Sequence, residues 1–169
     1  MNRLFSITDD AGFIALVDAH RYDAFVRQDW TFDDLRARFI REMRRRTLLI
    51  WATGIEGIWN VRITTDAVEH QPLRTLEARI DVTDGKLFLT SYDDLSMAAQ
   101  FPDESLPQKH NADLVFDIEN GTYDVRVHQL YDPDDPGLDF TGVHFEISIA
   151  KAMDGSVDPH EFEEIPWLR

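Results

Sequence analysis

The sequence of 169 residues contains no cysteine. This absence excludes disulfide frameworks, thiolate zinc sites and cysteine nucleophiles, and it is typical of proteins from a reducing compartment. Long apolar runs are absent as well, because Asp9 and Asp10 interrupt the apolar stretch near the start, so no secretory signal is predicted. No segment reaches the roughly 20 apolar residues of a membrane helix. We therefore expect a cytoplasmic protein without a membrane partner.

Positive charge is scarce. The chain has 17 basic and 32 acidic residues, which gives a formal net charge of -15. Such a surface repels phosphate backbones, so we expect no nucleic acid partner. It favours a basic protein as the partner, although a high net charge also serves solubility alone.

The sequence also lacks catalytic motifs. It contains no G-x-S-x-G turn, no phosphate-binding glycine loop and no H-E-x-x-H helix. Its carboxylates are too numerous for one acid–base pair to stand out. The sequence therefore does not favour an enzyme, and it indicates no cofactor.

Short segments with alternating apolar and polar residues are abundant, and this period is typical of half-buried strands. Turn pairs such as Asp84-Gly85 and Asn120-Gly121 separate them, as in hairpins. A chain of this length forms one domain, residues 1–169. We therefore predict an all-β fold, an antiparallel β-sandwich. Its nine predicted strands are residues 4–8, 13–18, 48–53, 58–63, 76–82, 86–92, 113–118, 122–130 and 143–150.

The segment 31–46 departs from this alternation. Apolar residues recur at every fourth position from Leu35 to Met43, which predicts an amphipathic helix with one buried face. Thr31 followed by Asp34 has the spacing of a capping box at the start of that helix. We therefore predict one helix inserted among the strands.

Arginines gather in the later turns of this predicted helix. Six Arg and one Glu lie between residues 36 and 46, a local charge of +5. The Arg cluster could bind a phosphate or an acidic partner, or it could neutralise acidic neighbours such as Glu161, Glu163 and Glu164 in the C-terminal tail. We favour the internal role.

Two parts of the sequence resemble each other. The stretch "EGIWNVRI" (56–63) returns as "NGTYDVRV" (120–127), and the hairpin at 7–18 resembles the one at 82–93. We infer two related halves, about 4–63 and 76–127, followed by the strand 143–150 and a tail. Strand alternation places Trp59, Val61, Tyr123 and Val125 inward, and Arg62 and Arg126 outward.

Acidic residues are concentrated in the connection 132–142. It resembles a calcium loop at its start, but Pro136 and Val143 occupy the fifth and twelfth positions, where calcium ligands belong. The connection is therefore either a solvated acidic loop or an anionic contact surface. Its four carboxylates are those of Asp132, Asp134, Asp135 and Asp139.

A second cluster consists of His128, His144 and Glu146, which alternation places on the outer face of neighbouring strands. Two imidazoles and a carboxylate could hold a metal ion. A simpler interpretation is an ion pair between Arg126 and Glu146 across the sheet, and we favour this pair over a metal site.

An ordered series of motifs runs along the chain. The motifs are Asp29-Trp30-Thr31 before the helix, "IEGIWNVRI" (55–63), Val82-Thr83-Asp84-Gly85, Gly121-Thr122-Tyr123 and "VHFEISIA" (143–150). This series, which covers most of residues 4–150, resembles the competence protein J family of inhibitors of the bacterial DNA-entry nuclease. The resemblance implies a binding protein that blocks a nuclease.

The favoured function is therefore inhibition of a nuclease, of the competence or toxin-immunity type, by an acidic surface that occupies the basic substrate channel. The expected contact residues are Asp132, Asp134, Asp135 and Asp139, with Asp103 and Glu104 in reserve. One alternative is a small-molecule or carbohydrate-binding sandwich that uses Trp30, Trp51 or Trp167. Another is a metal-dependent hydrolase that uses the His128 cluster. The sequence leaves a homodimer open.

Overall fold

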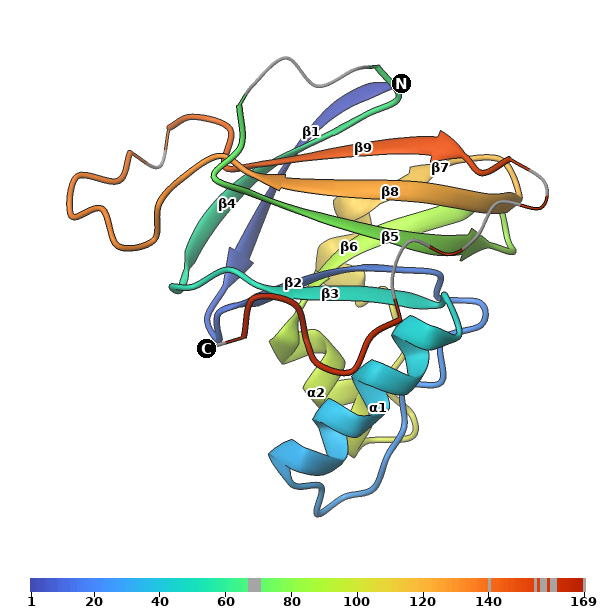
Figure 1. Ribbon diagram of the computed structural model, residues 1–169. Coiled ribbons are helices and arrows are strands. Elements are labelled where there is room, and N and C mark those ends of the chain that lie inside the picture. The colour runs from blue at the N-terminus through green and yellow to red at the C-terminus, as the bar shows by residue number, and fades with distance from the viewer. Residues whose placement is uncertain (67–70, 140, 154, 156–157, 159–160, 169) are drawn as a thin grey trace.

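The computed structural model describes residues 1–66, 71–139, 141–153, 155, 158 and 161–168. Within them the strands form two facing sheets (Figure 1). A five-stranded sheet has the order β1-β4-β9-β8-β5, and a four-stranded sheet has the order β3-β2-β6-β7. The strands are β1 (Asn2–Asp9), β2 (Phe13–Val17), β3 (Leu48–Ala52), β4 (Gly57–Thr64), β5 (Arg74–Val82), β6 (Lys86–Ser91), β7 (Val115–Asp117), β8 (Gly121–Gln129) and β9 (Phe145–Lys151).

The predicted β-sandwich is confirmed, and each predicted strand segment overlaps one observed strand. One pairing departs from the antiparallel expectation. Strand β9 lies between β4 and β8 and runs parallel to β4, with Val61 opposite Phe145, whereas its pairing with β8 is antiparallel. A parallel neighbour requires a long connection, and the chain between β4 and β9 provides one.

The core lies between the two sheets. The repeat residues Trp59 and Val61 on β4, and Tyr123 and Val125 on β8, are buried there as predicted. Strands β2 and β3 are buried at nearly every position, because one face meets the five-stranded sheet and the other is covered by helices.

The two parts of the chain that resemble each other pair their strands in the same way. In the first part β1 pairs with β4 and β2 with β3. In the second part β5 pairs with β8 and β6 with β7. The antiparallel pair β2·β6 joins them in the four-stranded sheet. We propose on this basis that the chain arose from two related halves.

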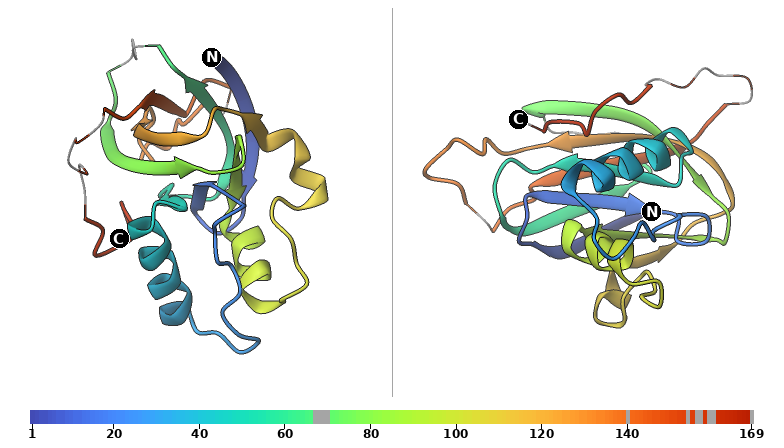
Figure 2. Two further views of the ribbon diagram at one scale, coloured as in Figure 1. Left: turned by 90° about the vertical axis from the view of Figure 1, so that its right-hand side faces the viewer. Right: turned by 90° about the horizontal axis from the view of Figure 1, so that it is seen from below.

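Helices α1 and α2 form a third layer on the side of the four-stranded sheet that faces away from the five-stranded sheet (Figures 1 and 2). Helix α1 (Phe32–Arg44) has the predicted capping box of Thr31 and Asp34 and buries Leu35, Phe39 and Met43. Helix α2 (Tyr92–Gln100) and the short 3-10 helix η1 (Lys109–Leu114) were not predicted. Phe39 and Tyr92 meet edge to face between the helices.

The C-terminal tail is part of the fold. The amide of Ala52, at the end of the edge strand β3, donates to the carbonyl of Pro166 at 3.0 Å. Phe162 and Ile165 are buried, and the Arg44 side chain donates to the carbonyl of Phe162 at 2.7 Å. The tail therefore covers the edge of the four-stranded sheet. In the described residues no helix is long and apolar enough to cross a membrane.

Candidate interaction surfaces

The arginines of α1 and the residues that follow it are engaged within the molecule. Arg38 and Arg41 pair with Asp23, Arg45 pairs with the buried Glu42, and Arg44 binds the tail carbonyl described above. The other two pairs are Arg36 with Glu164 at 3.7 Å and Arg46 with Asp158 at 2.9 Å. The predicted internal role is confirmed, since the cluster neutralises nearby carboxylates, including Glu164 and Asp158 in the tail.

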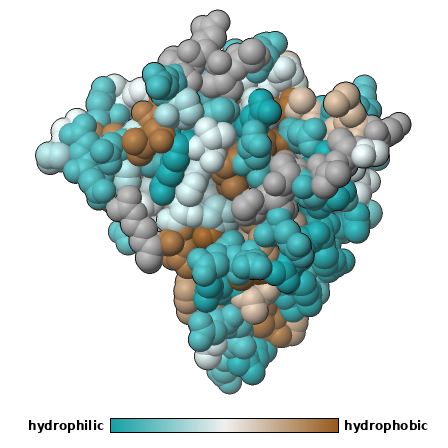
Figure 3. Space-filling model, in the orientation of Figure 1, coloured by the Kyte–Doolittle hydropathy of each residue, from teal (hydrophilic) through white to brown (hydrophobic). Residues whose placement is uncertain are grey.

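The acidic connection, described at residues 132–139, 141 and 142, projects beyond the ends of the sheets, at the left of Figure 1. Three of its carboxylates accept hydrogen bonds from the backbone two residues further on: Asp132 from Asp134, Asp135 from Gly137, and Asp139 from Thr141. These local turns hold the loop in shape while all four Asp residues stay exposed. Figure 3 shows that this projection is mainly hydrophilic.

The base of this loop is fixed in the core. The Tyr131 ring stacks on Trp59 with 4.7 Å between ring centroids, and its hydroxyl donates to the carbonyl of Thr53. Pro133 packs against Gly54, where an added Cβ would lie 2.9 Å from the proline ring. The four carboxylates are therefore displayed on a loop that begins at a rigid anchor.

Hydrogen bonds favour the charged form of one of these carboxylates. The hydroxyl and then the amide of Thr141 lower the pKa of Asp139 below its ordinary value. This carboxylate is therefore ionised at neutral pH and available to a cation.

Asp103 and Glu104 lie apart from the projecting loop. They follow α2, in the helical layer, and both are exposed (Figure 1). The structure therefore does not bring the six predicted contact residues together in one patch.

The His128 cluster differs from its prediction. His144 does not face solvent: it is only 1% exposed, its Nδ1 accepts the Asn60 amide at 2.9 Å, and its ring meets Trp59 edge to face. Burial lowers the pKa of His144. His144 precedes β9, so strand alternation does not govern where its ring points.

The expected partner of Arg126 was wrong. Glu146 pairs with Arg62 of the parallel strand β4 at 3.3 Å, whereas Arg126 pairs with Glu77 of β5 at 2.8 Å. His128 lies opposite Glu146 in the β8·β9 ladder. Among the described residues no three His, Asp or Glu side chains are arranged to hold a metal ion.

The tryptophans also differ from the stacking hypothesis. Trp51 is fully buried and packs against Phe145, so it cannot stack on a ligand, and Trp30 is half-buried against the core. Trp167 is half-buried in the tail, beneath the Arg74 guanidinium at 4.4 Å from the ring centroid.

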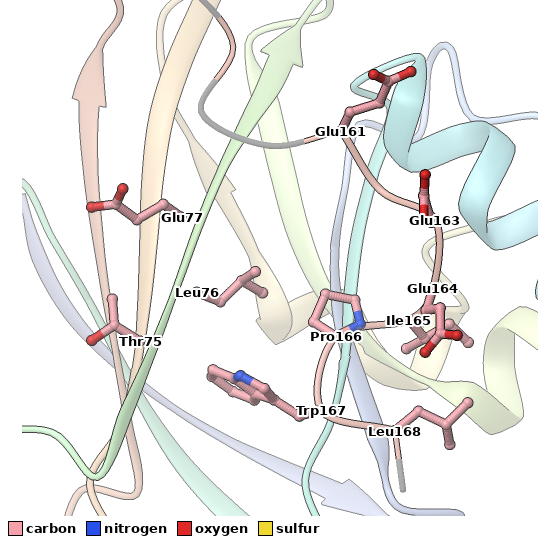
Figure 4. Close-up of a pocket in the computed structure, with 10 residues that line it drawn as sticks. All are labelled: Thr75, Leu76, Glu77, Glu161, Glu163, Glu164, Ile165, Pro166, Trp167 and Leu168. Carbon is pink, nitrogen blue, oxygen red and sulfur yellow. The ribbon is translucent and has the colours of Figure 1, made fainter.

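A groove that sequence reasoning missed lies between β5 and the tail (Figure 4). Its volume is about 540 Å³. Leu76 points into it from β5 and the Trp167 ring reaches into it from the tail, and carboxylates lie at its margins. These are Glu77 on β5 and Glu161, Glu163 and Glu164 on the tail. The sequence signal was the alternation of acidic and apolar residues in "EFEEIPWL" (161–168), whose docking position no local pattern reveals.

Two solved structures share this fold. The protein of crocagin biosynthetic gene J matches with a TM-score of 0.56 and 14% identity, over 90% of this chain and 96% of its own. ComJ from Bacillus subtilis, an inhibitor of the DNA degrading activity of NucA, matches with a TM-score of 0.51 and 10% identity, over 89% of this chain and 96% of its own. No protein-family model matches the chain, and no curated protein matches it in sequence. The resemblance to the competence protein J family is thus confirmed in the fold.

Proposed function

We propose that the protein inhibits a nuclease by occupying its electropositive substrate site. The observation that carries this proposal is the match to ComJ along almost the whole of both chains, since ComJ inhibits the DNA degrading activity of NucA. In this proposal the partner is a basic protein, and neither nucleic acid nor a cofactor takes part.

The charge distribution supports the proposal. A nuclease is positive where it holds the phosphate backbone, and this chain carries a net charge of -15. The cations around α1 are paired internally, so they do not cancel the acidic surface elsewhere. A rigid acidic surface can therefore take the place of phosphates in the substrate channel.

The projecting loop is the proposed contact surface. This loop carries four carboxylates on a base anchored by Tyr131, those of Asp132, Asp134, Asp135 and Asp139. Because the loop is already ordered, binding costs little conformational entropy. Asp103 and Glu104 are a second acidic contact at the helical layer. Truncating an Asp that is desolvated against Arg or Lys costs about 2–5 kcal/mol of binding free energy.

The test is capture followed by reconstitution. The immobilised protein is incubated at low salt with extract of the organism that encodes it, and bound material is eluted with salt and assayed for DNA degradation. We expect an eluted DNA-degrading activity that falls when the free protein is added back. A variant with all four loop Asp residues changed to Asn should restore degradation at the same concentration.

The control variant loses the same four charges elsewhere, by changing Asp29, Asp84, Asp113 and Asp117 to Asn, which are all exposed. It should inhibit nearly as well as the unmodified protein. The proposal is wrong if no captured fraction degrades DNA, or if the captured activity is insensitive to added protein. Equal losses in the two variants would reject the loop as the contact.

A further inference from the structure

Among the described residues, strand β5 is the last strand of the five-stranded sheet, and no strand pairs with its outer edge at Thr75 or Glu77. Its other edge pairs with β8. The Asp81 amide donates at 2.8 Å to the carbonyl of Arg46, away from β8. In an antiparallel strand the N–H and C=O groups of successive residues point to opposite edges. Thr75 and Glu77 are an even number of residues from Asp81, so their N–H and C=O groups also point away from β8. Such an edge is a template for an added strand.

The tail provides the opposite wall of the groove. It is held in place by the hydrogen bond between Ala52 and Pro166 and by burial of Phe162 and Ile165. The space of about 540 Å³ between tail and edge is typical of a binding cleft. A segment that added to β5 would lie in this space, so both walls would contact it.

The chemistry of the groove selects the segment. Side chains of an added strand alternate between the two faces of the sheet, so every second one would meet Leu76 and Trp167, and the others would lie beside Glu77. In the described part of the chain no cation pairs with Glu161 or Glu163. The pairs of Glu77 with Arg126 and of Glu164 with Arg36 are exposed and therefore weak, so an incoming cation can displace them.

We propose that the groove between β5 and the tail binds an extended basic segment of a partner protein by strand addition. The backbone of that segment pairs with Thr75 and Glu77, its apolar side chains cover Leu76 and Trp167, and its Lys or Arg side chains reach the four Glu residues. Charge complementarity favours this occupant over a second copy, which would bring its own Glu77 and a net charge of -15 to the edge. The proposal does not require the partner to be a nuclease.

The probe is a capped peptide of about eight alternating Lys and Val residues, long enough to pair with Thr75 and Glu77 of β5 and to extend beyond them. Binding is followed by amide chemical shifts of the isotope-labelled full-length protein. We expect the signals of Thr75 and Glu77 to shift, together with the indole signal of Trp167. Two further peptides carry N-methyl groups, one on the backbone amides of the Lys residues and the other on those of the Val residues. Each keeps the charge of the parent peptide but cannot donate hydrogen bonds along one of its two edges. The peptide that is methylated on the edge facing β5 should bind at least about tenfold more weakly than the unmethylated peptide.

Two variants separate the groove from the general negative charge. Glu161→Gln with Glu163→Gln should weaken binding of the Lys–Val peptide by about tenfold, whereas Asp29→Asn with Asp113→Asn, which removes the same charge elsewhere, should leave it nearly unchanged. Equal binding of all three peptides, or equal weakening by both variants, would mean that only nonspecific attraction acts. A dimer in sedimentation with β5 signals broadened before peptide is added would assign the edge to a second copy. Either result would overturn the proposal without bearing on the capture of a nuclease.

Discussion

At the scale of single residues, buried polar side chains decide how the strands are joined. Asp9 is fully buried at the end of β1, where one carboxylate oxygen accepts the amides of Ala11, Gly12 and Phe13. The other oxygen accepts the Thr53 hydroxyl at 2.8 Å and the indole N–H of Trp59 at 3.2 Å. One side chain thus links the turn into β2 with the end of β3 and with β4.

Replacing Asp9 by Ala should destabilise the protein strongly. The buried donors would lose their acceptor, and we expect the free energy of unfolding to fall by about 3 kcal/mol or more in urea titrations. Asp10→Ala, at the exposed neighbouring position, is the control and should change it by no more than about 0.5 kcal/mol. Similar losses in both variants would show that the network of Asp9 is not what holds the turn.

The buried His144 should make stability depend on pH. Burial lowers the pKa of His144 in the folded protein, whereas the unfolded chain has a His pKa of about 6.5. The unfolded state therefore binds more protons in this window, so the contribution is complete above about pH 6.5 and is lost as the pH falls toward the folded-state pKa. Protonation of Nδ1 would also remove its hydrogen bond from the Asn60 amide.

The measurement compares unfolding free energies of the unmodified protein and His144→Asn between about pH 7.5 and 5. Asn can accept the Asn60 amide without titrating. We expect the variant to lose less stability over this range than the unmodified protein. Parallel pH profiles would contradict the assignment to His144.

At the scale of elements, local sequence patterns predicted the strands and the helix α1 whose burial follows a regular period. The alternation in β4 predicted that Trp59 and Val61 are buried, and the spacing from Leu35 to Met43 predicted α1. Helix α2 was not predicted because it is short and its buried side chains give only a weak apolar stripe. These are Asp94, Leu95, Ala98 and Ala99. The position of the tail could not be predicted, because the tail docks against β3 through contacts between segments far apart in the sequence, and local periodicity carries no information on such contacts.

The tail should contribute to stability as a docked element. Ile165 is buried against the core, and Ile165→Ala should lower the free energy of unfolding by about 2–5 kcal/mol in urea titrations. Glu163→Ala, two residues earlier and exposed, is the matched control and should stay within about 0.5 kcal/mol. If Ile165→Ala also had no effect, the tail would not be docked in solution.

At the scale of the whole molecule, strand order could not be predicted. The parallel pair β4·β9 joins segments more than eighty residues apart in the chain. The groove forms because the tail docks on the edge strand β3 of one sheet, next to the edge strand β5 of the other. The acidic loop was visible in the sequence as a cluster, but whether Asp103 would join it depended on the placement of α2. Composition did define the net charge, and that property belongs to the molecule as a whole.

The net charge of -15 and the local loop contacts should act on different rate constants of partner binding. Long-range attraction raises the association rate and is screened by salt, because the Debye length falls from about 10 Å at 0.1 M to about 3 Å at 1 M. Contacts desolvated in the complex govern dissociation instead.

In stopped-flow mixing with the captured nuclease, we therefore expect the association rate constant to fall steeply as the salt concentration rises. Changing the four loop Asp residues to Asn should raise the dissociation rate constant far more than the charge-matched control does. An association rate constant that does not change with salt would contradict steering by the acidic surface. Equal dissociation rate constants for the loop variant and the charge-matched control would place the contact outside the loop.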